Sequence, residues 1–244
     1  MTSTSPYHVA IIMDGNRRWA AKNKLKTVFG HSAGSEVIKS IIDESNNLGI
    51  KILSLFCFST ENWKRPKAEI NYLMNLMSKY LHKEMENVKK NNIKLQSFGD
   101  LSELPEPCKS DLLNSIEKTK NNTGLVLNFC MNYGGQEDIL SAVKSIAKEV
   151  KENNLAIRNI DHQLIEDNLF TKNLPDPDLI IRTSGELRLS NFFLWQAAYS
   201  EFYFTEKLWP DFTPKDLEFA CIEYSKRKRR FGGNKAQTKH QPNL

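Results

Sequence analysis

A carboxylate and two arginines follow the first apolar segment of the sequence. After Val9–Met13 come the six residues Asp14, Gly15, Asn16, Arg17, Arg18 and Trp19. An Asp-Gly-Asn turn at the end of a strand exposes a carboxylate, which Mg²⁺ favours, together with several backbone N–H groups. Arginine side chains and free N–H groups bind phosphate oxygens. The pattern predicts a site for a phosphorylated ligand with a divalent cation, while a plain turn with solvated arginines also fits it.

A second polar cluster follows the apolar run Ile52–Phe58. Its members are Ser59, Thr60, Glu61, Asn62, Trp63, Lys64, Arg65 and Pro66. Hydroxyl groups, an amide, an acid, an indole and a guanidinium are thus gathered in one connection between a strand and a helix. Trp63 either anchors this loop on the core or lies in a site, and the sequence leaves both readings open.

A third cluster follows Leu179–Ile181 and runs from Arg182 to Ser190. Hydroxyl groups and a glycine separate Arg182 from Arg188, so these two side chains could hold a diphosphate from two sides. The planar fork of arginine suits phosphate oxygens better than the point charge of lysine. Glu201 opens the last apolar run and is a candidate for a second carboxylate near the cation.

The elements that must position these clusters alternate along the chain. The predicted strands are short, continuously apolar runs, as in strands covered on both faces. They are Val9–Met13, Ile52–Ser59, Leu95–Phe98, Leu125–Met131, Leu179–Arg182 and Glu201–Thr205. Helical periodicity occupies residues 33–48, 68–90, 139–150 and 213–224 between them.

This alternation predicts an α/β fold with a mostly parallel sheet of about six strands flanked by helices. Ligands of such sheets bind at the carboxyl ends of the strands, where all three clusters stand. We expect one domain over residues 1–233 and a polar, disordered tail over residues 234–244.

Several protein classes are disfavoured by what the sequence lacks. It contains no Walker A loop, no Gly-x-Gly-x-x-Gly and no obvious Ser–His–Asp arrangement, which favours an enzyme that handles diphosphates without being an ATPase. The four cysteines include no Cys-x-x-Cys pair, so a zinc site or a disulfide framework is not expected. The apolar runs are too short for a membrane span and the first residues lack the features of a secretion signal, so we expect a cytoplasmic protein.

The net charge of +5 is concentrated at one end of the chain. Residues 226–244 hold seven basic residues and no acid, so the rest of the chain carries a net charge of −2. A basic run of this kind is usually a solvated surface, although it can also contact nucleic acid or anionic lipid.

Six motifs, in order, resemble those of the cis-prenyltransferases, the isoprenyl transferases typified by undecaprenyl diphosphate synthase. They are Met13–Ala20, Phe29–His31, Phe58–Pro66, Asn132–Gly135, Arg182–Ser190 and the segment from Leu208–Phe212 through Arg229–Gly233. The resemblance implies a homodimer whose subunits each have a parallel sheet flanked by helices and an apolar product tunnel. It implies that isopentenyl diphosphate is condensed onto an allylic diphosphate, expected to be farnesyl diphosphate, in successive cis additions.

The expected product is a polyprenyl diphosphate such as undecaprenyl diphosphate, a precursor of a lipid carrier. Such a product partitions into membranes, so the resemblance allows a peripheral position at the membrane surface, and it implies no nucleic-acid partner. The Asp-rich metal motifs of the trans-prenyltransferases are absent from the sequence.

The resemblance also implies roles for individual residues. Asp14 and Asn62 would be catalytic, and Asp14 and Glu201 would hold Mg²⁺ as the cofactor. The residues implied to bind the substrates are Gly15, Asn16, Arg17, Arg18, Trp19, Thr27, His31, Ser59, Thr60, Glu61, Trp63, Arg65, Arg182, Arg188, Leu189 and Ser190. Asn62 stands where the family usually places its proton acceptor. Because a neutral amide is a poor base, we expect Asn62 to orient the substrate while a diphosphate oxygen or water takes the proton.

Three positions depart from the usual pattern of the family. Thr27 stands where arginine is usual, which removes one expected phosphate contact, and Arg17 stands where many members have glycine. Ser184 replaces a frequent glycine. These changes leave Asp14 and Asn62 untouched, so activity is still expected.

Product length is expected to depend on apolar walls. The helices predicted over 33–48 and 68–90 would supply these walls, although their apolar faces also fit an ordinary core. The resemblance places Leu125 at the floor of the tunnel.

Three functions other than prenyl transfer also fit parts of the sequence. Ile11–Gly15 imitates the aspartate loop of haloacid-dehalogenase-like phosphatases, but that chemistry needs a second aspartate where Asn16 stands. A catalytically silent partner subunit would have lost the loop residues, which are all present. Nucleic-acid binding would rest only on the short basic run Lys226–Arg230.

Overall fold

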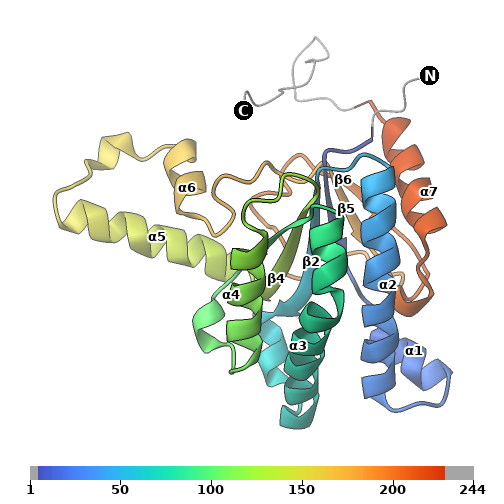
Figure 1. The fold of residues 1–244 in the computed structure, drawn as a ribbon. Coiled ribbons are helices and arrows are strands. Elements are labelled where there is room, and N and C mark those ends of the chain that lie inside the picture. The colour runs from blue at the N-terminus through green and yellow to red at the C-terminus, as the bar shows by residue number, and fades with distance from the viewer. Residues whose placement is uncertain (1–4, 229–244) are drawn as a thin grey trace.

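Six strands form one sheet in which every neighbouring pair is parallel. The structure is a computed structural model, and it describes residues 5–228 of the chain. The strands are β1 (His8–Ile12), β2 (Ile52–Ser59), β3 (Lys94–Phe98), β4 (Val126–Tyr133), β5 (Leu179–Arg182) and β6 (Glu201–Phe204). They lie in the order β3-β4-β2-β1-β5-β6 (Figure 1), which confirms the predicted parallel sheet and its six strands.

Helices connect the first five strands in turn, no helix lies between β5 and β6, and a last α-helix follows β6. They are α1 (Asn16–Lys22), α2 (Thr27–Asn47), α3 (Lys67–Lys90), α4 (Cys108–Thr119), α5 (Gly135–Lys151), α6 (His162–Asn168) and α7 (Pro214–Ser225), with single 3-10 turns η1 (Thr60–Lys64), η2 (Leu101–Glu103), η3 (Ile157–Asn159) and η4 (Trp209–Asp211). Four helices lie where periodicity predicts them, but α2 begins earlier than expected, at Thr27. The sequence did not predict α4 and α6, because the buried face of α4 includes Ser115 and Thr119 and α6 buries no residue at all.

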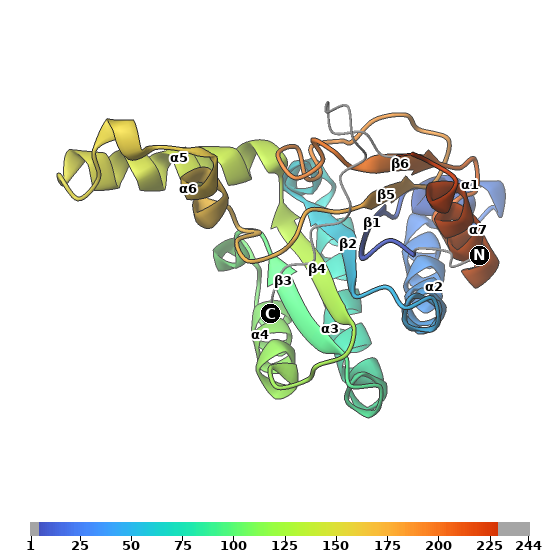
Figure 2. The ribbon, with the colours of Figure 1, turned by 90° about the horizontal axis from the view of Figure 1, so that it is seen from above.

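The two faces of the sheet are covered differently (Figure 2). One face packs against α2, α3, α4 and α7 through a large cluster that includes Ile41, Met74, Leu112 and Leu217. The other face packs against the segment after β5, where Phe192 and Phe193 stack on each other with ring centroids 4.2 Å apart. Apolar residues therefore point to both sides of the strands, which explains their continuous apolar sequences.

Local signals fix several element boundaries. Gly49 has a φ of +76° just beyond the end of α2, as expected of a glycine that terminates a helix. At the start of α7, the Thr213 N–H donates to Asp216 Oδ2 over 2.8 Å, which completes the predicted capping box.

The described part of the chain ends within the expected domain. Residues 229–233 of that domain and the predicted tail over 234–244 lie outside the described residues. Between residues 5 and 228, no helix combines the length and apolar character needed to cross a bilayer.

Candidate active site

The three polar clusters follow three adjacent strands. Strand β1 lies between β2 and β5, so the residues after each strand meet at the carboxyl edge of the sheet. They line the mouth of a cavity of about 920 Å³. The predicted site residues that line this cavity are Asp14, Gly15, Asn16, Arg17, Arg18, His31, Ser59, Glu61, Asn62, Arg65, Arg182 and Ser190. The prediction that the clusters converge is confirmed.

Asp14 and Arg182 form an ion pair at this mouth. Arg182 Nη2 donates to Asp14 Oδ2 over 2.8 Å, and the Gly15 N–H donates to Asp14 Oδ1 over 2.7 Å. Burial opposes the charged form of Asp14, but the hydrogen bond and positive charge of Arg182 outweigh it and lower the pKa of the carboxyl. Asp14 is therefore a carboxylate at neutral pH, as a cation ligand must be.

Arg182 is buried, with a side chain only 4% exposed, and it retains an unused donor. Its Nη1 donates to Ser190 Oγ over 2.7 Å and to the Arg188 carbonyl over 2.5 Å. No described group accepts from Nε, although this atom is buried. A buried N–H without a partner costs free energy, and burial also keeps Nε away from a ligand, although Arg182 as a residue lines the cavity wall.

Glu186 links Arg18 to Arg188, a connection that the sequence did not predict. Its Oε1 lies 3.1 Å from Arg18 Nη1, and its Oε2 accepts a short hydrogen bond from Arg188. Arg188 does not line the cavity in this arrangement. Ser184 has a φ of +80°, which explains why glycine is frequent there, and its Oγ accepts from Arg18 Nη2 over 2.5 Å.

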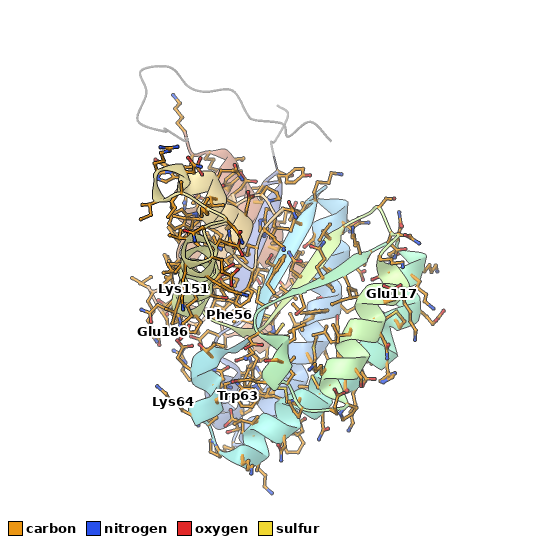
Figure 3. All side chains as sticks on the ribbon, turned by 90° about the vertical axis from the view of Figure 1, so that its left-hand side faces the viewer. Phe56, Trp63, Lys64, Glu117, Lys151 and Glu186 are labelled. Atoms are coloured by element: carbon orange, nitrogen blue, oxygen red, sulfur yellow. The ribbon has the colours of Figure 1, made fainter. Side chains whose placement is uncertain are left out.

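The loop after β2 is held by its own amide. Asn62 Nδ2 donates to Ser59 Oγ over 2.8 Å, and the Ser59 N–H donates to Asn62 Oδ1 over 3.3 Å. Both ends of the Asn62 amide are thus engaged, which agrees with an orienting role. Trp63 does not line the cavity: its Nε1 donates to Asn132 Oδ1 over 2.7 Å and its ring meets Phe58 edge-on at 5.0 Å. Trp63 anchors the loop, while its neighbour Lys64 is exposed (Figure 3).

Asn191 joins the loop after β5 to the two segments that follow β2 and β4. Its Nδ2 donates to Glu61 Oε1 over 2.8 Å and to Glu137 Oε2 over 3.0 Å, while its Oδ1 accepts from the Gln136 N–H over 2.8 Å. The sequence did not single out Asn191, because neither Glu137 nor Glu61 is near it in the chain.

A buried carboxylate contacts a histidine and an arginine on the other side of the mouth. Glu69 Oε1 lies 3.1 Å from His31 Nε2 and accepts from Arg65 Nη1 over 3.2 Å. Burial lowers the pKa of His31, although the hydrogen bond to Glu69 acts in the opposite direction. Sequence reasoning missed Glu69, because its partner His31 lies on a different helix.

Four other predicted site residues lie beside the cavity rather than in its wall. Trp19 Nε1 donates to Asp211 Oδ1 over 2.7 Å, and Leu189 packs against the aromatic cluster of Phe192. Thr60 and Thr27 do not line the cavity, and Thr27 is simply the first residue of α2.

Glu201 corrects the predicted metal site. It is the first residue of β6 and pairs with Leu179, the first residue of β5, at the amino edge of the sheet. Asp14 follows the carboxyl end of β1, at the opposite edge. Glu201 Oε2 accepts from Arg227 Nη1 over 2.8 Å instead. The prediction that Glu201 joins Asp14 is therefore wrong within one chain.

The interior of the cavity is apolar. Its wall is formed by two helices and two strands, through Ile38, Phe56, Phe58, Leu73, Met74, Met77, Tyr80, Phe129 and Met131. Both helices that were expected to supply apolar walls, over 33–48 and 68–90, line this cavity.

Two aromatic rings lie in the part of the cavity wall that is farthest from the mouth along α3 and β4. Tyr80 is the wall residue of α3 farthest along the helix from its start at the mouth, and Phe129 is the earliest wall residue of β4. Their ring centroids lie 6.2 Å apart in an edge-on arrangement. Leu125 is buried in the core and does not line the cavity, so the placement of Leu125 at its floor is not supported.

Comparison with known proteins agrees with this geometry. Residues 12–232 match the family model described as "Putative undecaprenyl diphosphate synthase". The chain is 52% identical to an isoprenyl transferase of Clostridium tetani, over 93% of this chain and 89% of that protein. It is 50% identical to an isoprenyl transferase of Clostridium perfringens, over 94% of this chain and 91% of that protein.

Solved structures show the same fold. Lavandulyl diphosphate synthase from Lavandula x intermedia, solved in complex with dimethylallyl diphosphate, superposes with a TM-score of 0.92 at 39% identity, covering 94% of this chain and 99% of that one. A probable undecaprenyl diphosphate synthase from Campylobacter jejuni gives 0.77 at 35% identity, covering 94% and 100%. Since the match extends over nearly the whole chain and includes all three loops of the cavity, the protein belongs to the undecaprenyl diphosphate synthase family and is a cis-prenyltransferase.

Proposed function

We propose that the protein condenses isopentenyl diphosphate with an allylic diphosphate, farnesyl diphosphate in the first instance, in successive cis additions. The proposal rests on one observation: a single cavity has arginine side chains at its mouth and apolar side chains in its interior. A diphosphate needs the first and a growing hydrocarbon chain needs the second. A phosphatase or a nucleotide-binding enzyme would not need the apolar interior.

The two diphosphates would bind on opposite sides of Asp14. The proposed contacts of the allylic diphosphate are Arg17, Arg18, Arg65 and His31, all of which line the cavity. The resemblance assigns the isopentenyl diphosphate to the other side of the mouth, where Arg182 and Ser190 already hydrogen-bond each other and Arg188 is close. The positive charge of Arg182 at the cavity wall supports an anion at this position.

The residues of the mouth fit a magnesium ion that is shared with a substrate. Asp14 is charged and lies at the cavity wall, and no group of three or more metal-ligating side chains occurs among residues 5–228. Mg²⁺ commonly binds through one or two carboxylates plus substrate phosphates, so a single Asp14 is sufficient on the protein side. Bound there, it would neutralise negative charge that develops on the departing diphosphate. Arg182 would then exchange its contact with Asp14 for one with phosphate.

The chain's own groups would perform the remaining work. Arg18 and His31 hold the allylic diphosphate while its C–O bond breaks, which stabilises the leaving charge. The loop that Asn62 and Ser59 rigidify keeps the isopentenyl double bond close to the allylic carbon, so that the carbon–carbon bond can form. Because both ends of the Asn62 amide are engaged with Ser59, a diphosphate oxygen or water is the better acceptor for the proton that is then lost.

Two kinds of diphosphate synthase occur among the similar proteins. The relatives include a probable undecaprenyl diphosphate synthase, whereas the structural neighbour with the higher TM-score is a lavandulyl diphosphate synthase. We favour a polyprenyl diphosphate, used as a lipid-carrier precursor in the cytoplasm near the membrane, because the cavity continues past the mouth to Tyr80 and Phe129.

Incubation with farnesyl diphosphate, labelled isopentenyl diphosphate and Mg²⁺, followed by separation of the products by chain length, tests the proposal. A ladder of successive additions supports it. A single condensation product would favour a short-chain synthase, and release of inorganic phosphate without chain growth would favour a phosphatase.

We also propose that two copies of the chain form the active molecule. The helix α5 extends away from the sheet (Figures 1 and 2), and its Leu140 and Val143 side chains are 52% and 54% exposed. Apolar side chains exposed on a projecting helix support an interface with a second subunit.

A further inference from the structure

The turn between α1 and α2 carries an unbalanced positive charge. Between Gly15 and Ser35 the sequence contains five basic residues and no acid. Two of the five, Arg17 and Arg18, line the cavity mouth. The other three, Lys22, Lys24 and Lys26, are exposed, and none of them forms an ion pair with a residue in the described part of the chain.

Two apolar side chains stand among these lysines. Leu25 is 44% exposed and Phe29 is 52% exposed. Leu25 precedes Lys26, the N-cap of α2, and a side chain at that position usually packs on the fourth residue of the helix. The fourth residue is Gly30, and the Asn16 carbonyl oxygen lies 2.0 Å from where a Cβ would be. The close contact between α1 and α2 thus leaves Leu25 without its usual partner.

The turn borders the cavity mouth. Helix α1 begins directly after the carboxyl end of β1, and α2 starts at this edge and runs back toward the start of β2 (Figure 1). His31, one turn of helix beyond the lysines, lines the cavity. The exposed lysines and apolar side chains therefore lie at the same edge of the molecule as the site where an apolar product would form.

We infer that this basic-apolar turn, Lys22–Phe29, docks the protein on anionic lipid bilayers with the cavity mouth next to the membrane. The combination favours a bilayer, because interfacial binding uses apolar side chains inserted at the headgroup level together with cations that attract anionic lipids. A nucleic acid would use the lysines but has no use for an exposed leucine. The purpose of the contact, release of a lipid product, rests on the proposed function, whereas the contact itself can be measured without substrates.

Vesicle flotation of the full chain tests the inference. The probes are vesicles of equal parts phosphatidylglycerol and phosphatidylcholine, compared with pure phosphatidylcholine. The first variant is Leu25→Ser with Phe29→Ser, and the second is Lys22→Gln with Lys24→Gln and Lys26→Gln. A control, Leu113→Ser with Phe219→Ser, removes side chains that are 46% and 50% exposed on α4 and α7, so it matches the first variant in exposed apolar area.

The parent should float with the anionic vesicles and much less with the neutral ones. The triple lysine variant should bind about a hundredfold more weakly, since each basic residue near such a surface contributes about a fivefold factor. The leucine–phenylalanine variant should also lose binding, and the control should keep it. Elongation of farnesyl diphosphate in detergent should be unchanged in all variants, which separates this inference from the proposed function.

Three results would overturn the docking inference. The first is a parent protein that does not float with anionic vesicles. The second is that both turn variants bind as strongly as the parent, which would assign the binding to the basic end over residues 226–244. Equal loss in the control would show that any exposed apolar side chain has the same effect. In each case a normal product ladder would leave the proposed function intact.

Discussion

The carboxylate of Asp14 can pair with Arg182 or bind a cation, and the proposed reaction requires that it change from the first to the second. Without ligands it pairs with Arg182 over 2.8 Å, so its negative charge is already balanced. When a cation and two diphosphates bind, the same carboxylate is free to hold the cation, because Arg182 then has phosphate oxygens to bind.

Replacement of Asp14 by asparagine should therefore lower turnover by about a thousandfold while the fold survives, because several kcal/mol of leaving-group stabilisation depend on the cation. Steady-state elongation and thermal unfolding measure the two effects. Asp100→Asn is the matched control: Asp100 also follows a strand, β3, but it binds Ser102 and lies outside the cavity wall. Near-parental turnover of Asp14→Asn would remove Asp14 from the metal site.

Arg182 contributes a planar guanidinium group with several donors, which lysine cannot reproduce. Its Nη1 reaches Ser190 Oγ and the Arg188 carbonyl while its Nη2 reaches Asp14. In Arg182→Lys we expect the KM for isopentenyl diphosphate to rise about tenfold to a hundredfold, since one or more charged hydrogen bonds are lost. The KM for farnesyl diphosphate should change much less. Equal increases in both would show that Arg182 does not distinguish the two substrates.

At the scale of elements, α3 and β4 supply the aromatic residues of the cavity wall that lie farthest from the mouth. Tyr80 and Phe129 meet edge-on, each from one of these elements, and Leu125 lies beyond them in the core. A growing chain that reaches the rings can extend only if they move or are removed.

Replacement of Tyr80 by alanine should lengthen the product by one or more five-carbon units, because a large ring is removed from the end of the cavity. Chromatography of the labelled products measures the shift. Leu125→Ala is the comparison variant: it should lower the free energy of unfolding by about 2–5 kcal/mol without changing product length. The reverse pattern, longer products from Leu125→Ala alone, would restore Leu125 as the floor.

At the scale of the whole molecule, α5 exposes apolar side chains that no other residue between 5 and 228 covers. Changing Leu140 and Val143 to aspartate should convert a dimer to monomers, because both side chains are about half exposed and charges there would be buried at an interface. Light scattering coupled to gel filtration measures the mass. A parent that is already monomeric, or a variant that stays dimeric, would place the interface elsewhere or exclude it.

The sequence predicts much of this molecule because continuous apolar runs mark buried parallel strands, and polar clusters after them mark one edge of the sheet. What it could not predict is which charged groups pair across the fold. Glu69 contacts His31, Glu186 contacts Arg18, and Asn191 joins three segments, and in each case these partners lie far apart in the sequence.

Glu201 illustrates a different failure. It opens a strand, and residues that open parallel strands lie at the amino edge, away from the ligands. The strand direction alone therefore separates Glu201 from Asp14, and a resemblance that placed them together did not account for this. Trp63 shows the opposite case, since either role suited its sequence and only the contact with Asn132 decides for an anchor.

We propose that one cavity binds two diphosphates at its mouth and holds the growing chain behind them. Product sizing with farnesyl diphosphate and labelled isopentenyl diphosphate, with Mg²⁺ and then with excess EDTA, tests it most directly. We predict a ladder of products that differ by five-carbon units, lost on chelation and restored by added Mg²⁺. Absence of labelled product with Mg²⁺ present, or a ladder that EDTA leaves unchanged, would show that the cavity does not work in this way.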